Sequence, residues 1–337
     1  MTSASDPFAE RSSVSLRKRL NVLGADFTVE SSNAAALQLA VDAFGELPRI
    51  RLTREPQRFR VRIVTSGQGA TWPRGATPPR PRLTAGNGLL CATVDASNFA
   101  IVDLAQARAL ICLSPAMLRH PYYARYELIE LAMVTLASRG QSLVPLHAAC
   151  IGAGGSGVLL MGPSGAGKST LALHALAGGM QLLSEDSAFI AADTLRATGT
   201  PNYLHVTPTA LSFLGKGPLL SQIRRAPMIR RRSGTQKHEL DLRTVPGRIA
   251  KAPLQIAAMV FLSRRPTTRP SALEPLGRRA SLQRLRREQP YAAGLSNWRD
   301  FERRTTALPA YELRRTAHPD AAIDQLRALL ATAPKLA

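Results

Sequence analysis

The sequence predicts an α/β fold, in which a phosphate-binding core at residues 141–337 follows a smaller α+β region at residues 1–140. Residues 162–170 read Gly-Pro-Ser-Gly-Ala-Gly-Lys-Ser-Thr and match the pattern G-x-x-x-x-G-K-[ST] at every fixed position. An apolar run at 158–161 precedes this loop, and a run without helix breakers, 168–177, follows it. Buried strand, glycine-rich loop and helix therefore come in the order that phosphate binding requires.

The first region reads as strands with two helices. Its polar and apolar alternation predicts strands at 26–30, 58–65, 89–95 and 99–113, the last as a hairpin or two pieces, and helices at 33–44 and 122–137. Four prolines at 71–82 predict a loop or an unstructured segment. The sequence assigns no role to residues 1–140.

The second region begins with an apolar run at 143–151 and a glycine-rich turn, which predict an antiparallel hairpin with the strand before the phosphate loop. If Ile151 pairs with Val158, His147 falls opposite Gly162, at the mouth of the loop. An imidazole there can donate to a phosphate oxygen or assist proton movement. The alternative is a structural histidine in an apolar strand.

The remaining elements follow in order. A strand at 180–183 completes a parallel strand–helix–strand crossover. Beyond it, strands or short helices are predicted at 204–213, 239–243 and 256–262, a loop at 224–238, and an amphipathic helix at 320–332.

The loop residues have defined roles in phosphate binding. Backbone N–H groups at the start of a helix favour an anion, the lysine reaches the β- and γ-phosphates, and the next hydroxyl binds Mg²⁺. The predicted ATP-binding residues are Gly162, Pro163, Ser164, Gly165, Ala166, Gly167, Lys168, Ser169 and Thr170. A glycine-rich turn without function is the alternative.

Two acids, Glu185 and Asp186, follow the strand at 180–183, at the sheet edge where the phosphates would lie. Residues 141–215 contain one other acid, Asp193. Carboxylates in this place can hold Mg²⁺ or its waters, or accept the proton of an attacking hydroxyl. The alternative is that the pair caps the next turn.

These segments together resemble the catalytic core of the HPr serine kinases. The resemblance rests on Leu146-His147-Ala148-Ala149, the glycine-rich turn, the loop at 162–170 and Ser184-Glu185-Asp186, with their spacing. It implies a phosphate-loop fold of the type shared with phosphoenolpyruvate carboxykinases. It implies catalytic roles for His147, Lys168 and Asp186, with Asp186 as proton acceptor and Ser169 and Glu185 on the metal side.

The chain also departs from that family. Glu185 stands where the family has an aspartate, Thr170 where it has a glutamate, and the segment for the reverse, phosphorylase reaction has no clear counterpart. Relatives of the family phosphorylate a serine of HPr, a serine of a peptide precursor or free serine. The core motifs do not choose among these acceptors.

The net charge of +21 is concentrated in residues 216–337, which hold 25 basic and 9 acidic residues. This pattern fits an acidic protein or peptide substrate, nucleic acid, or a solvated arginine-rich surface. Aromatic residues make up 5% of the chain and do not interleave with the basic clusters, so nucleic acid is not the expected partner. Arg231, Arg232 and Lys237 are predicted to stabilise the transferring phosphate from a mobile loop.

The sequence has no apolar run of membrane-spanning length, and its first residues do not read as a signal peptide. Three widely spaced cysteines suit neither a disulfide framework nor a zinc site. A cytoplasmic location is therefore expected, with no membrane partner. Whether the chain forms a homo-oligomer stays open.

The sequence as a whole predicts an ATP- and Mg²⁺-dependent kinase that phosphorylates a hydroxyl, foremost a serine of a protein or peptide. The alternatives are a phosphate-loop ATPase that acts on nucleic acid through its basic half, and a nucleotide-binding regulator.

Overall fold

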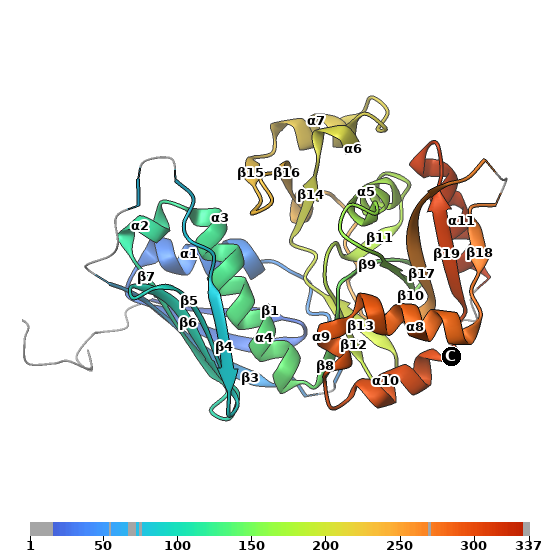
Figure 1. Cartoon of the computed structure of the whole chain (residues 1–337). Helices are drawn as coiled ribbons and strands as arrows, with labels where there is room; N and C mark the ends of the chain where they lie inside the picture. Colours follow the sequence, from blue (N-terminus) through green and yellow to red (C-terminus); the bar gives the residue numbers. More distant parts are fainter. Residues whose placement is uncertain (1–15, 54, 67–71, 74–75, 269–270, 333–337) are drawn as a thin grey trace, which may run out of the picture. The chain divides into compact units, whose positions relative to one another are not determined.

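The computed structural model describes residues 16–53, 55–66, 72–73, 76–268 and 271–332, and shows a mixed α/β protein with three sheets (Figure 1). The chain separates into two compact units. The first holds the described residues up to Gly45 and from Pro56 to Gln141. The second holds the described part of Glu46–Glu55 and everything described from Ser142 onward, so the segment at 46–55 belongs with the core and not with the N-terminal region in which the sequence placed it.

The first unit is a seven-stranded sheet with helices on one face (Figure 1). Its order is β1-β2-β3-β7-β6-β5-β4, with β2, β3 and β7 parallel and the other neighbours antiparallel. The elements are β1 (Leu16–Val22), β2 (Ala25–Ser31), α1 (Ala34–Phe44), β3 (Arg58–Thr65), β4 (Arg82–Gly86), β5 (Leu89–Asp95), β6 (Asn98–Asp103), β7 (Arg108–Leu113), α2 (Pro115–Leu118), α3 (Pro121–Tyr123), a π-helical segment (Ala124–Glu130) and α4 (Leu131–Gly140). The strands and the helix predicted between 26 and 113 are confirmed, whereas β1 and β4 were missed. Part of the predicted loop at 71–82 lies outside the described residues.

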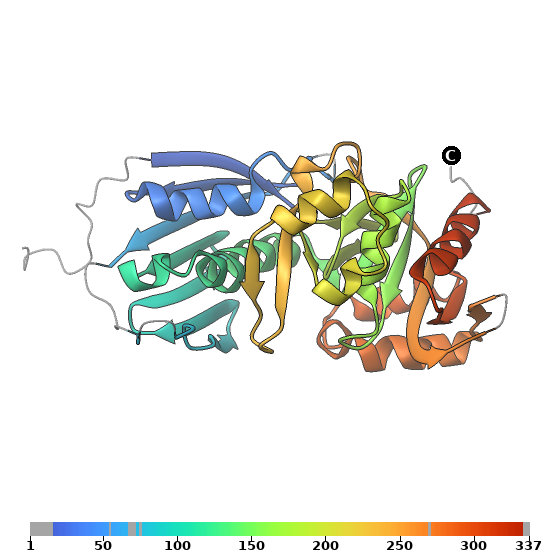
Figure 2. The same ribbon diagram turned by 90° about the horizontal axis from the view of Figure 1, so that it is seen from above.

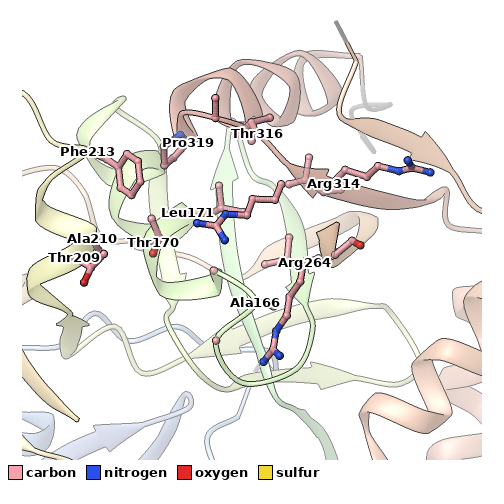
Figure 3. Close-up of a pocket in the computed structure, with 18 of the residues that line it drawn as sticks. Ala166, Thr170, Leu171, Thr209, Ala210, Phe213, Arg264, Arg314, Thr316 and Pro319 are labelled. Carbon is pink, nitrogen blue, oxygen red and sulfur yellow. The ribbon is translucent and has the colours of Figure 1, made fainter. Parts of the chain in front are cut away.

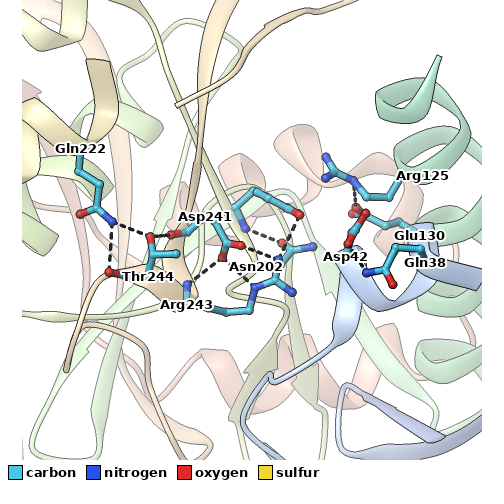
Figure 4. A network of polar contacts seen from close by, with 10 residues as sticks. Gln38, Asp42, Arg125, Glu130, Asn202, Gln222, Asp241, Arg243 and Thr244 are labelled. Carbon is cyan, nitrogen blue, oxygen red and sulfur yellow. Dashed lines mark hydrogen bonds and ion pairs between the residues drawn. The ribbon is translucent and has the colours of Figure 1, made fainter. Parts of the chain in front are cut away.

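The helix predicted at 122–137 is interrupted by the π-helical segment. Arg125 is buried there, and its Nε lies 3.2 Å from Oε1 of Glu130, five residues on (Figure 4). In a π-helix the backbone hydrogen bonds join residues five apart, so this wider turn brings the two charged side chains together. On α1, Gln38 donates to Asp42 across one α-helical turn, at 2.8 Å.

The second unit is built on a nine-stranded sheet, with a separate sheet of three strands. Along the main sheet the order is β11-β9-β10-β17-β13-β12-β8, and β19 pairs with both β17 and β18. The elements are β8 (Leu143–Leu146), β9 (Ala148–Ala153), β10 (Ser156–Met161), α5 (Lys168–Ala177), β11 (Gln181–Ser184), β12 (Ala188–Ala191), β13 (Arg196–Gly199), β14 (Tyr203–Val206), α6 (Pro208–Leu211), α7 (Pro218–Arg225), β15 (Met228–Arg230), β16 (Gln236–Asp241), a 3₁₀ turn (Leu242–Thr244), β17 (Leu254–Pro266), β18 (Leu273–Pro275), α8 (Arg278–Glu288), α9 (Pro290–Ala293), α10 (Trp298–Thr305), β19 (Ala310–Arg315) and α11 (Pro319–Ala331).

Helices cover both faces of the main sheet, as expected for strands that are apolar throughout (Figures 1 and 2). On one face α5 and α11 pack against side chains such as Val158, Leu160 and Val260. On the other face α8, α9 and α10 pack against the alternate residues, including Leu159 and Phe261. The loops at the ends of the strands are thereby held between two packed layers.

The predicted hairpin before the phosphate loop is confirmed in register, because Ile151 pairs with Val158. The apolar run at 143–151 is not one strand, however. It divides at His147 into β8, which pairs with β12, and β9, which pairs with β10. His147 therefore lies at the crossing point between two strands, and its side chain is exposed.

The strand after α5 runs in the direction that the crossover predicts. Both β10 and β11 are antiparallel to β9, which lies between them, so the two point the same way. The carboxyl end of β11 and the phosphate loop therefore meet at one edge of the sheet. Among the described residues, no helix has both the length and the apolar character to cross a membrane.

The prediction of a loop at 224–238 is wrong. The segment begins with the end of α7 and continues as the β15–β16 hairpin, which joins β14 in the three-stranded sheet (Figure 2). Its strands lack a continuous apolar pattern because they are short and the buried residues of β16 do not alternate with exposed ones. At the base of the sheet, Asp241 receives two bonds of 2.7 Å from the Arg243 guanidinium, which also reaches the Tyr203 hydroxyl at 3.1 Å (Figure 4).

Candidate active site

The phosphate loop joins β10 to the first turn of α5. Gly165 and Gly167 have φ angles of 77° and 105°, a region that side chains with a Cβ rarely occupy, so the bend requires glycine at both positions. The first N–H groups of α5 have no partner within the helix, and the helix dipole adds partial positive charge there. The segment is therefore built to receive an anion.

Lys168 is buried and lies across the loop. Its Nζ donates to the Gly162 carbonyl at 2.6 Å and reaches the Pro163 carbonyl at 3.5 Å. Burial lowers the pKa of this lysine, against the raising effect of the nearby carboxylates of Asp186, Glu288 and Glu185. The ammonium group thus sits at the centre of the loop, where it can meet a phosphate oxygen.

Four side chains form a continuous chain of hydrogen bonds beneath the loop, which we call the buried network: Ser169, Glu185, His205 and Glu239. The Ser169 hydroxyl donates to Oε1 of Glu185. His205 lies between two carboxylates, with Nδ1 3.1 Å from Oε2 of Glu185 and Nε2 3.1 Å from Oε1 of Glu239. The last three residues are each at most 8% exposed.

Charge pairing in this network outweighs the cost of burial. Burial alone would raise the pKa of Glu185, but the hydrogen bond and charge of His205 and the Ser169 hydroxyl lower it to about 2. Burial alone would lower the pKa of His205, but its bonds to Glu185 and Glu239 raise it to about 9. Near neutral pH the network therefore holds a protonated His205 against an ionised Glu185.

The adjacent acid faces a different environment, which we call the open cluster: Asp186, His147 and Arg231. Oδ1 of Asp186 lies 3.3 Å from Nδ1 of His147, and Oδ2 lies 3.7 Å from Nη2 of Arg231. The side chains of Asp186 and His147 are 37% and 48% exposed. The structure thus brings together three residues that the sequence predicted separately.

His147 is held through its backbone and not through its ring. The buried side-chain amide of Gln289 accepts from the His147 N–H at 2.7 Å and donates to the His147 carbonyl at 3.3 Å. This amide satisfies the backbone groups that the break between β8 and β9 leaves without a strand partner. The imidazole is thereby positioned at the surface, with Nδ1 near Asp186.

Of the three predicted phosphate-stabilising residues, Arg231 lies closest to the acids. Lys237, on β16, lies near enough for its charge to lower the pKa of both Glu185 and Lys168. Arg232 is exposed in the hairpin turn. A fourth cation comes from the end of β17, where Arg264 donates to the Ser164 carbonyl in the phosphate loop.

A cavity of about 280 Å³ opens beside the loop (Figure 3). Thr170 and Phe213 line one side, and Arg264 extends from the other side toward the loop at Ala166. Further walls come from α6, from the start of α11 and from the ends of β17 and β19, two strands that are parallel to β10. Carboxyl ends of neighbouring parallel strands are where α/β sheets bind ligands, so the cavity continues the phosphate site.

The oxygen atoms of Ser169 and Glu185 suit Mg²⁺, which prefers oxygen donors and usually binds through one or two side chains plus phosphate oxygens and waters. In the part of the chain that the structure describes, no group of three His, Cys, Asp or Glu side chains could hold a metal ion.

Sequence reasoning missed four residues of this site: His205, Glu239, Gln289 and Arg264. His205 and Glu239 are separated from Glu185 along the chain and are direct partners across β14 and β16, and no short motif encodes such a pairing. Arg264 left a usable signal, because it closely follows the apolar strand predicted at 256–262, as the acid pair follows the strand at 180–183.

Comparisons with known proteins give no family assignment. No family model matches the chain, and no curated protein matches it. Among solved structures, the HPr(Ser) kinase/phosphatase from Coxiella burnetii aligns with 55% of this chain and 94% of its own, at 13% sequence identity and a TM-score of 0.29. A likeness this low assigns neither fold nor activity.

Proposed function

We propose that this protein is an ATP- and Mg²⁺-dependent kinase that transfers the γ-phosphate to a hydroxyl, foremost a serine of a protein or peptide. One observation carries the proposal. A glycine-rich loop at a helix N-terminus, a lysine, a Ser–Glu pair and an Asp–His–Arg cluster converge at one edge of the sheet. Phosphoryl transfer needs this combination of anion binding, a metal side and a proton acceptor.

The residues divide the work as follows. The loop N–H groups and Lys168 bind the phosphate oxygens. Asp186 is accessible and accepts the proton of the attacking hydroxyl. His147 and Arg231 flank Asp186 and stabilise the negative charge of the transferring group.

Ser169 and Glu185 would hold Mg²⁺ together with phosphate oxygens, and the ion would supply further charge neutralisation there. The nucleoside occupies the cavity beside the loop, where the Phe213 ring offers a stacking surface. The hydrogen bond between Ser169 and Glu185 holds these two residues together on the metal side.

The acceptor is an acidic protein or peptide segment. Arg224 and Arg225 at the end of α7 and Arg230 and Arg232 on the β15–β16 hairpin are exposed, close along the chain to Arg231 of the open cluster. Like-charged side chains gathered near a site attract an acidic partner and speed its association.

The test is transfer of label from γ-labelled ATP to serine-containing peptides. Lys168→Ala and Asp186→Asn should abolish it, whereas Asp193→Asn, at an exposed acid in the turn after β12, should leave it intact. ATP hydrolysis that DNA or RNA stimulates, without transfer to any peptide, would favour a phosphate-loop ATPase acting on nucleic acid. No nucleotide binding at all would end both proposals.

A further inference from the structure

The buried network contains a histidine that lies outside the phosphate loop and is almost fully enclosed. His205 is 7% exposed and sits on β14, directly opposite Glu239 of β16 in the register. Cross-strand partners project to the same face of a sheet, so the pairing places Glu239 beside His205, whose other ring nitrogen meets Glu185. Through Ser169 the chain of contacts ends in the first turn of α5.

Hydrogen counting fixes the direction of these bonds. The two carboxylates can only accept, so each nitrogen of His205 donates, one to Glu185 and one to Glu239. The Ser169 hydroxyl has one hydrogen and uses it on Glu185. The lone pairs of the serine oxygen are therefore directed away from Glu185 and are available to a cation.

We propose that His205 is a positioning residue that holds Glu185 against Ser169, and thereby sets the serine oxygen for the metal ion of a bound nucleotide. This inference rests on the proposed function, and it adds a role that no motif in the sequence assigns. His205 acts through Glu185 and does not touch the phosphates. Glu239 fixes the orientation of the His205 ring, because it accepts a hydrogen bond from Nε2, the nitrogen that does not bind Glu185.

The physical reason is the cost of burying charge. Without the imidazole, Glu185 and Glu239 would be two carboxylates in a buried space with no shared donor, which is unfavourable. Glu185 would then turn away from Ser169 toward water. This change removes the acceptor of the Ser169 hydrogen, so the hydroxyl would rotate and its lone pairs would lose their fixed direction.

The experiment measures how much Mg²⁺ strengthens binding of a non-hydrolysable ATP analogue to the full-length chain, by calorimetry with and without the metal. His205→Phe removes both bonds and keeps a ring of similar size, and Glu239→Gln weakens the bond to Nε2. Asp241→Asn is the matched control, because it makes the same acid-to-amide change two residues along β16, where Asp241 binds Arg243 and not the network.

We expect the strengthening by Mg²⁺ to fall about tenfold in His205→Phe and about threefold in Glu239→Gln. Metal-free affinity should stay unchanged in both, and Asp241→Asn should behave as the wild type. A purely structural pair would lower stability without touching this difference. If His205→Phe does not fold, as judged by circular dichroism, Glu239→Gln decides the matter by the same measurement.

Two failures are distinguishable. A wild-type chain that binds no nucleotide, or gains nothing from Mg²⁺, would overturn the proposed function. A wild-type chain with a clear gain that the folded variants retain in full would overturn the role of His205 and leave the kinase proposal standing.

Discussion

The buried network and the open cluster contain two neighbouring acids, Glu185 and Asp186, which differ in burial and in how tightly they are bound. Glu185 is enclosed and accepts from both Ser169 and His205. Asp186, one residue on, is 37% exposed and has only loose contacts, at 3.3 and 3.7 Å. Both residues lie in the bend that follows β11, where Glu185 is enclosed and Asp186 is open to the surface, so one acid pair serves both environments.

The comparison teaches how one short segment can combine rigidity with reactivity. A carboxylate whose partners are fixed on all sides is suited to holding another group in place. A carboxylate with accessible oxygens can approach a substrate hydroxyl and accept its proton. The following predictions separate the two environments, from the largest effect to the smallest.

The largest effect should come from removing the proton acceptor. Asp186→Asn should lower kcat about 10²–10⁴-fold and leave nucleotide affinity unchanged, because an amide cannot take the proton. Glu185→Gln should instead weaken the Mg²⁺-dependent part of nucleotide binding. Steady-state kinetics with a peptide substrate and calorimetry measure the two effects. Equal losses of kcat and affinity in both variants would contradict the division of roles.

Stability should distinguish the two histidines. His205→Leu leaves buried carboxylates without their cation and should lower the free energy of unfolding by about 3–5 kcal/mol. His147→Leu changes an exposed side chain and should cost less than about 0.5 kcal/mol. Urea unfolding followed by circular dichroism measures both. Similar costs for the two variants would mean that the buried network is not a structural element.

The pH dependence of stability should follow the same histidine. The pKa of His205 is raised to about 9 in the folded chain, from about 6.5 in an unfolded chain. Its contribution is therefore complete below about pH 6.5 and is lost as the pH rises through about 9. The free energy of unfolding should fall by about 2–3 kcal/mol over this range.

The control for this pH effect is His205→Leu, whose stability should decline less over the same range. Glu185 acts in the opposite direction, because its lowered pKa gives a contribution that is present above about pH 4.5 and lost as the pH falls toward 2. An equal decline of the wild type and the variant above pH 8 would show that another group is responsible.

The smallest effect tests the two arginines of the hairpin turn. Arg231→Ala should lower kcat about tenfold to a hundredfold, because its guanidinium lies beside Asp186. Arg232→Ala, its exposed neighbour, should change kcat less than about twofold. Peptide phosphorylation rates measure both. A larger loss of kcat in Arg232→Ala than in Arg231→Ala would contradict the role proposed for Arg231. It would make Arg232 the catalytic cation and place the acceptor on the other side of the turn.

Local patterns predicted much of this molecule. Residue type and spacing were enough to predict the loop at 162–170, helix α5 and the Ile151–Val158 register. Each of these features depends on residues that are close together in the chain. The β15–β16 hairpin was mistaken for a loop, because its strands are short and have no regular apolar period. The break between β8 and β9 at His147 was also missed. A continuous apolar run has the same pattern whether it forms one strand or two successive strands.

The sequence by itself determined that a phosphate loop, a lysine, a serine and an acid pair would meet at one sheet edge, because strand direction follows from the crossover. Only the tertiary structure decided which acid is buried and which is open. That choice depends on His205 and Glu239, which lie 20 residues beyond Glu185 and 34 residues beyond His205. Burial and pairing of charge are properties of the packed chain, and no segment encodes them alone.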